Sequence, residues 1–185
     1  PPPLPTPCVP APSGLVSWWQ GESNALDSAD GNHGTLQGNV DFVPGKVGQT
    51  ISFNGVDADV RVPASANLDV GPGGGLTIET WINPVDVSVE RPIAEWNSGN
   101  YGPHFWIAVG AGSGGSGPGS LYANLRDVNF IEHKIASAAG ILSSNVWQHV
   151  AVTYDKSSGV ATLYLNGSVV AQTSLGIFTP GTASD

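Results

Sequence analysis

Residues 147–155 decide the fold class, and they read Trp147-Gln148-His149-Val150-Ala151-Val152-Thr153-Tyr154-Asp155. The larger apolar side chains of Val150, Val152 and Tyr154 fall on every second position, with Ala151 and Thr153 between them. Because successive side chains of a strand point to opposite faces, this alternation predicts a β-strand with one buried face.

A second strand follows at once, from Val160 to Leu165, and it ends at Asn166-Gly167. These two residues readily adopt the positive φ values that a type I′ turn requires. Residues 168–173 can then return as a third strand. The segment from Trp147 onward therefore predicts an antiparallel hairpin arrangement.

The rest of the chain repeats this pattern of short apolar runs separated by turn residues, and no segment has a sustained helical period. A dozen strands in one domain predict an all-β fold, an antiparallel sandwich of two sheets packed face to face. We also expect Trp18, Trp81 and Trp147 to lie in the core. The other expected strands are Leu15–Trp19, Gly34–Leu36, Ile51–Phe53, Asp59–Val62, Leu76–Ile82, Ile93–Trp96, Phe105–Val109, Ser120–Arg126 and Phe130–Ala136.

Composition narrows the classes of function. The chain has 185 residues, enough for one sizeable core, and a net charge of −9. Its six Lys and Arg residues are scattered, so no basic stripe exists to neutralise phosphates, and we expect no nucleic-acid partner. No apolar run approaches the roughly 20 residues needed to cross a bilayer, so we expect no membrane insertion.

The first 13 residues differ from the remainder because they contain seven prolines. Proline favours an extended polyproline-type conformation and removes backbone donors. We therefore expect residues 1–13 to form an arm or linker and residues 14–185 to form the sandwich. The single cysteine, Cys8, has no partner for an internal disulfide.

Several segments, in order, resemble a known family. They are Gly14-Leu15-Val16-Ser17-Trp18-Trp19, residues 27–36, Gly45-Lys46-Val47-Gly48-Gln49 with Ile51-Ser52-Phe53-Asn54-Gly55, residues 76–82, residues 147–154 and residues 163–167. Together they are similar to laminin-G-like domains of the concanavalin A-like lectin/glucanase superfamily, especially the bacterial extracellular type. The resemblance covers about Gly14 to Thr179 and implies a jelly-roll sandwich that serves as a secreted or cell-surface binding or adhesion module.

The resemblance also implies further strands after residue 178, and the sequence stops at Asp185. Two hypotheses follow. The chain is an extracellular module that binds carbohydrate or a surface protein. Alternatively, it is a structural subunit of a filament, in which neighbouring copies complete the sandwich by strand donation.

The spacing of the carboxylates along the sequence argues against catalysis. Glycoside hydrolysis needs two carboxylates flanking the scissile bond, which in this superfamily would lie close together on one strand. The expected pattern, a Glu, an Asp two residues on and a further Glu on one strand face, is not formed by Glu79, Glu90, Glu95 or Glu132, and no Gly-x-Ser-x-Gly elbow is present. We therefore predict that the protein is not an enzyme. The glycine-rich residues 110–119 are expected to form a flexible connection.

Aromatic residues around that connection are the candidate ligand-binding residues. Sugar rings stack on aromatic faces, while amide, imidazole and guanidinium groups bond their hydroxyls. The alternative for the two tryptophans of this group is that they alternate into the core. The candidates are Trp96, Tyr101, His104, Trp106, Asn124 and Arg126, with Asn97 and Asn100 as further polar groups.

Calcium is the candidate cofactor. Glu22, Asn24 and Asp27 offer oxygen ligands in one short loop, and Asp30 and Asn32 offer a second set close by. In the family that the sequence resembles, a structural calcium often joins the opening loop to the terminal strand. Turn chemistry alone is the other explanation for such a cluster of Asp, Asn and Gly.

Overall fold

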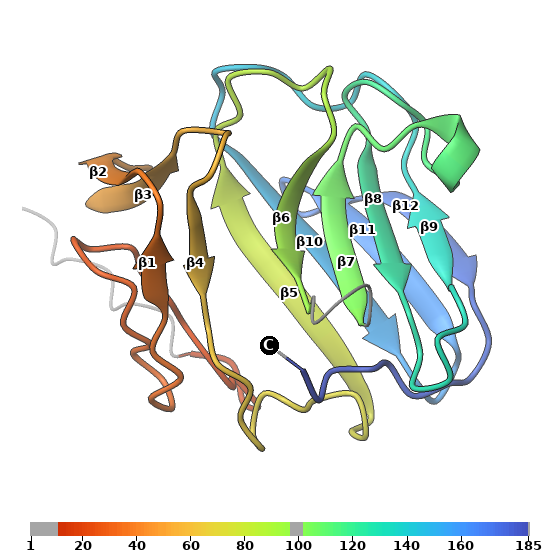
Figure 1. Cartoon of the computed structure of the whole chain (residues 1–185). Helices are drawn as coiled ribbons and strands as arrows, with labels where there is room; N and C mark the ends of the chain where they lie inside the picture. The colour runs from red at the N-terminus through yellow and green to blue at the C-terminus, as the bar shows by residue number, and fades with distance from the viewer. Residues whose placement is uncertain (1–10, 97–101, 185) are drawn as a thin grey trace, which may run out of the picture.

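Two four-stranded antiparallel sheets face each other in the computed structural model, which describes residues 11–96 and 102–184 (Figure 1). One sheet has the order β12-β11-β10-β5 and the other the order β6-β7-β8-β9. The first contains β5 (Gly75–Ile82), β10 (Gln148–Asp155), β11 (Val160–Leu165) and β12 (Ser168–Ser174). The second contains β6 (Arg91–Glu95), β7 (Pro103–Ile107), β8 (Leu121–Leu125) and β9 (Lys134–Ala136). The predicted all-β sandwich is confirmed.

Two smaller sheets lie to one side of the sandwich (Figure 1). In one, β1 (Thr35–Gln37) pairs with β4 (Asp59–Arg61), and in the other β2 (Val40–Pro44) pairs with β3 (Gln49–Phe53). The 3-10 turn Ala111–Ser113 is the single helical element within the described ranges. Across those ranges, no helix has the length and apolar character that a membrane span demands.

The core lies between the two large sheets, and the opening segment supplies much of it. Val150, Val152 and Tyr154 are buried, as their alternation predicts, and they face Phe105 and Leu121 of the other sheet within one apolar cluster. The predicted turn is also present, since Asn166 and Gly167 have φ values of 50° and 80°.

Two expectations about the first half of the chain are wrong. Residues 15–19 form no strand and contribute only an isolated bridge between Trp19 and Asp27. Trp18 is 51% exposed and Trp81 is 45% exposed. Trp81 shares a strand face with Thr77 and Glu79, whereas Leu76 lies on the opposite face and joins the core. The Lys46 ammonium lies 5.1 Å from the centroid of the Trp81 ring.

The segment after β12 crosses one end of the sandwich without forming a strand in residues 175–184. The hydroxyl of Thr182 accepts from the Gly71 backbone N–H at 2.7 Å and donates to Asp69 at 2.8 Å. A Cβ at Gly71 would lie 1.9 Å from the carbonyl oxygen of Pro180, so this close approach requires glycine. Of the predicted arm, residues 1–10 lie outside the described residues, and residues 11–13 are exposed.

Candidate functional site

A groove of about 540 Å³ opens on the outer face of the β6-β7-β8-β9 sheet. Its position follows from strand alternation. On β7, Phe105 and Ile107 point into the core, so His104 and Trp106 point outward. The alternative in which Trp106 alternates into the core is therefore wrong.

One row of polar side chains crosses the sheet through this groove. Strand pairing places Glu95 of β6 opposite His104 of β7, His104 opposite Asn124 of β8, and Asn124 opposite Lys134 of β9. All four side chains line the groove. Because neighbouring strands lie about 4.8 Å apart, the row presents a carboxylate, an imidazole, an amide and an ammonium across about 14 Å.

An aromatic pair lies in the next row of the same sheet face. Trp106 of β7 is paired with Tyr122 of β8, and both line the groove. The indole Nε1 of Trp106 donates to Oε2 of Glu95 at 2.9 Å, which fixes the ring against the polar row. The groove therefore combines aromatic rings with hydrogen-bonding groups.

The glycine-rich connection forms one wall of the groove. Hydrogen bonds from Gly114 to Ala111 and from Gly117 to Val109 fold it into compact turns, and Gly112 and Ser113 line the groove. The Tyr122 hydroxyl donates to the Ser113 carbonyl oxygen at 3.3 Å. Burial, together with the carboxylates of Glu132 and Glu90, raises the pKa of Tyr122 to about 12, so this hydroxyl keeps its proton at neutral pH.

Salt bridges and hydrogen bonds hold the charged groups at the other wall. Oε2 of Glu132 lies 2.7 Å from the Lys134 ammonium, and its Oε1 accepts from the Asn124 amide at 3.2 Å. The Lys134 interactions lower the pKa of Glu132, so its carboxylate stays ionised. The side-chain oxygen of Asn124 in turn accepts from the His133 backbone N–H at 3.1 Å. These contacts orient the amide before any ligand arrives.

Four of the six predicted ligand-binding residues line this groove: His104, Trp106, Asn124 and Arg126. Trp96 follows β6 and is partly buried, but it is not part of the lining. Tyr101, with Asn97 and Asn100, lies outside the described residues. Sequence reasoning missed Glu90, Glu95, Val109, Gly112, Ser113, Tyr122, Glu132 and Lys134. The alternation of β8, which puts Tyr122 on the face of Asn124, was the available signal for one of them.

His104 gives the groove a pH dependence. Its Nε2 atom is buried and has no hydrogen-bond partner within the described part of the chain. Burial lowers the pKa of His104 from its ordinary value of 6.5; Glu95 and Glu132 oppose this shift, and Arg126 adds to it. The folded protein therefore holds a neutral imidazole at pH values where the unfolded chain is already protonated.

We expect the contribution of the neutral His104 imidazole to the free energy of unfolding to be complete above pH 6.5. Below that value the free energy of unfolding should fall as the pH drops. The fall arises because the unfolded state binds the proton first. Urea denaturation at intervals from pH 7.5 to 5 measures it, and His104→Gln should flatten the slope. An unchanged slope in the variant would assign the acid sensitivity to other groups.

The predicted calcium residues lie in the opening loop, where their side chains bond to the backbone. Oδ1 of Asp27 accepts from the backbone N–H groups of Trp18 and Ala29, both at 2.8 Å. Its Oδ2 accepts from those of Asp30 at 3.2 Å and Asn32 at 2.9 Å. These four bonds occupy the lone pairs of the carboxylate. Burial opposes ionisation, but the bonds from Trp18, Ala29 and Asn32 outweigh it, so the pKa of Asp27 is strongly lowered.

The other two predicted ligands are engaged in the same way. Glu22 accepts from the Gln49 backbone N–H at 3.2 Å, and the Asn24 oxygen accepts from that of Leu26 at 2.9 Å. In the described residues, no group of three or more His, Cys, Asp or Glu side chains is arranged to hold a metal ion. As placed, the three side chains fit turn stabilisation better than metal coordination, and calcium binding stays a prediction.

Metal removal tests calcium binding directly. With the Asp27 oxygens already bonded, we expect an excess of EDTA to leave the melting temperature unchanged, within one degree or so. Differential scanning calorimetry with and without added calcium is the measurement. A melting temperature that rises with calcium and falls with chelator would show that the loop rearranges to bind the ion.

Comparison with solved structures finds the same fold in binding domains. The receptor-binding domain of botulinum neurotoxin C/D mosaic serotype has a TM-score of 0.66 and 16% identity, covering 90% of this chain and 41% of that one. A botulinum neurotoxin type C structure, from work on cell entry that depends on two ganglioside molecules, has a TM-score of 0.62 and 19% identity over 92% and 43% of the two chains. The chain thus spans about two fifths of these neurotoxin chains.

Another similar structure is a single domain. Domain 4 of AbnA, a GH43 extracellular arabinanase from Geobacillus stearothermophilus, was solved in complex with arabinotriose. It has a TM-score of 0.61 and 18% identity, covering 92% of this chain and 81% of that one. At such identities the likeness establishes the fold. None of the curated proteins compared with the chain matches it.

A protein-family model identifies the family of the chain more directly than these structures do. The laminin G model whose description is Concanavalin A-like lectin/glucanases superfamily matches residues 54–185, which is more than half of the chain. The match begins just before β4 and includes both large sheets and every residue of the groove. The chain therefore belongs to the laminin G family of the concanavalin A-like lectin/glucanase superfamily.

Proposed function

We propose that the protein is a non-catalytic, extracellular carbohydrate-binding module whose groove takes a neutral oligosaccharide. The observation that carries this proposal is the pair of adjacent rows on the outer face of the β6-β7-β8-β9 sheet. One row holds Trp106 and Tyr122, and the other holds Glu95, His104, Asn124 and Lys134. Sugars need this combination because each ring has apolar C–H faces and a polar edge.

The charge of the groove favours a neutral sugar over an acidic one. Three carboxylates line it, those of Glu90, Glu95 and Glu132, against the two cations Arg126 and Lys134. Lys134 is already paired with Glu132 at 2.7 Å. The chain also has a net charge of −9. A sialylated or uronic acid ligand would therefore meet net repulsion on approach.

The carboxylates are better suited to binding than to hydrolysis. Retaining or inverting hydrolysis needs a general acid whose pKa is raised, opposite a second free carboxylate. The pKa of Glu132 is instead lowered by Lys134. Glu95 accepts from the Trp106 indole, and Glu90 accepts from the Gly110 backbone N–H at 2.9 Å. Each carboxylate is thus occupied in shaping the groove, which supports a binding role.

The similar structures add support of a general kind. One is a domain in complex with arabinotriose, and another belongs to a toxin whose entry depends on gangliosides. The arabinanase is extracellular and the neurotoxin enters cells, which supports an extracellular location for this chain and a role in adhesion or targeting.

A glycan array tests the proposal. The chain should bind neutral oligosaccharides and leave sialylated ones unbound, and isothermal titration with arabinotriose and with α2,3-sialyllactose should confirm that order. Binding restricted to acidic glycans would contradict the charge argument. Failure to bind any glycan on the array would overturn carbohydrate recognition as a whole.

A surface protein or another copy of the chain is the second candidate partner, and one edge of the sandwich favours self-association. Strand β12 runs for seven residues, Ser168–Ser174, without charge or proline, and Val169 on it is 55% exposed. The edge strand β6, by contrast, carries Pro92 and a register shift, features that block strand addition. Sedimentation velocity across a concentration series tests self-association, and a monomer at every concentration would exclude strand pairing between copies.

A further inference from the structure

The loop between β8 and β9 holds Phe130 in a conformation that aromatic residues avoid. Its φ is 65°, in the left-handed region, and its side chain is 53% exposed. The other non-glycine residues of positive φ in the described ranges are Ser23, Ala108, Asn145 and Asn166, and none of them is aromatic. Because asparagine and glycine adopt this region more readily, turn geometry alone does not account for a phenylalanine here.

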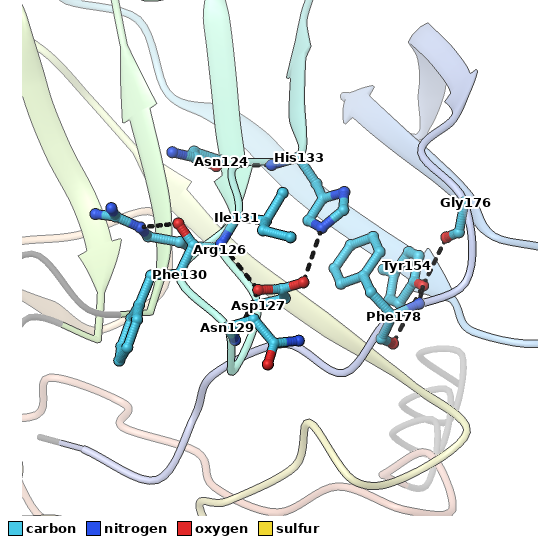
Figure 2. Close-up of polar contacts among 10 residues, drawn as sticks. All are labelled: Asn124, Arg126, Asp127, Asn129, Phe130, Ile131, His133, Tyr154, Gly176 and Phe178. Carbon is cyan, nitrogen blue, oxygen red and sulfur yellow. Dashed lines mark hydrogen bonds and ion pairs between the residues drawn. The ribbon is translucent and has the colours of Figure 1, made fainter.

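The turn that imposes this conformation is centred on the carboxylate of Asp127 (Figure 2). Its Oδ1 accepts from the backbone N–H groups of Asn129 at 2.8 Å and Ile131 at 2.9 Å, on either side of Phe130. Its Oδ2 lies 3.3 Å from Nε2 of His133. The backbone of Phe130 is therefore fixed from both sides.

A stack of rings connects this turn to the core (Figure 2). The His133 ring lies parallel to the Phe178 ring, with centroids 3.5 Å apart, and Phe178 stacks on Tyr154 at 4.5 Å. The Tyr154 hydroxyl accepts from the Phe178 backbone N–H at 3.0 Å. The strained residue is thus carried by a rigid support, as expected where unfavourable backbone geometry serves a function.

Phe130 is also connected to the groove. Its carbonyl oxygen accepts from Nε of Arg126 at 3.0 Å, and Arg126 lines the groove. Figure 2 shows the Phe130 ring and the Arg126 guanidinium extending to the same side of the strand end. One turn therefore positions both a cation in the groove and an aromatic ring just beyond it.

We propose that Phe130 is a ligand-binding residue that extends the groove past Arg126 and stacks on a sugar ring outside the groove. The inference rests on the proposed function and specifies the length of the ligand. From Tyr122 to Arg126 the groove runs along four residues of strand, about 13 Å, so a ring that reaches Phe130 belongs to a chain of several sugars. A monosaccharide in the groove would not touch it.

Titration of arabinotriose and of arabinose into Phe130→Asn tests this proposal. Asparagine keeps the left-handed conformation and the carbonyl that Arg126 contacts, but it removes the ring. We expect the Kd for arabinotriose to rise about threefold to tenfold, the range of one aromatic contact, and binding of arabinose to stay unchanged. The melting temperature should stay level or rise, because the strain at residue 130 is relieved.

Two further variants sharpen the outcome. Phe130→Tyr keeps a ring and should bind arabinotriose as the native chain does. Asn145→Gly changes another residue of positive φ, away from the groove, and should leave binding unchanged. Equal arabinotriose affinity in Phe130→Asn and the native chain would overturn the proposal for Phe130 alone, and a clear drop in its melting temperature would assign the ring to packing instead. A native chain that binds no glycan on the array would contradict the proposed function itself.

Discussion

Replacing Asp127 with alanine is expected to lower the free energy of unfolding by about 3 kcal/mol, because three hydrogen-bond donors lose a buried, charged acceptor. Asp127 is 5% exposed, and it accepts from the backbone N–H groups of Asn129 and Ile131 and from the His133 ring. Its neighbour Val128 donates to the Thr179 carbonyl oxygen at 3.0 Å, so the turn also holds the segment after β12. Urea denaturation at neutral pH measures the loss.

The pKa of Asp127 gives the same variant a second readout. Burial opposes ionisation, but the bonds from Ile131, His133 and Asn129 more than offset it, so the pKa is lowered below its ordinary value of 3.8. The contribution of Asp127 to stability is therefore complete above that value and is lost as the pH falls below it. Asp127→Ala should lack this part of the acid-induced loss.

Asp155→Ala is the matched control for this prediction. Asp155 also holds a turn, accepting from the Ser157 backbone N–H at 2.9 Å, but it is exposed to solvent. Water can replace the acceptor there, so the loss of stability should be much smaller. If both variants lose the same free energy of unfolding, burial of the carboxylate does not explain how Asp127 stabilises its turn. The support proposed for Phe130 would then be weaker than the contacts imply.

The sandwich was predictable because its signal is local. Alternation from Val150 to Tyr154 and the Asn166-Gly167 turn each depend on a few consecutive residues, and both were confirmed. The strand expected at residues 15–19 is absent, because an apolar run does not show whether another strand lies alongside it to pair with. Trp81 was misassigned for a similar reason: alternation separates two faces without telling which one is covered.

The candidate groove was only half predictable, because it depends on pairings between strands. His104, Trp106, Asn124 and Arg126 were found from their residue types on successive strands. The sequence pattern of Glu95 bears only on catalysis, for which it has no carboxylate partner along its own strand, whereas the β6–β7 register places it opposite His104 in the groove. Glu132 and Glu90 enter the groove from connections whose path no local pattern specifies.

Trp106→Ala is expected to raise the Kd for a bound neutral oligosaccharide by about thirtyfold, or on the order of 2 kcal/mol, the size of a central aromatic contact. Trp106 carries the ring at the middle of the groove, between Glu95 on one strand and Tyr122 on the other. Because its side chain lies on the outer face of the sheet, the core is left intact, and the melting temperature should fall by no more than a few degrees. Isothermal titration and calorimetry measure the two effects.

Trp81→Ala supplies the matched control, since Trp81 is a 45% exposed tryptophan on the outer face of the opposite sheet. Its loss should leave glycan affinity unchanged, and an equal drop in both variants would mean that binding does not take place in the groove. Trp106→Phe separates the two contributions of the indole. It retains a ring for stacking but removes the N–H that donates to Glu95 at 2.9 Å. Near-native affinity in Trp106→Phe would assign the binding energy to ring stacking. A loss as large as that of Trp106→Ala would show instead that the indole acts mainly by holding the Glu95 carboxylate in place for sugar hydroxyls.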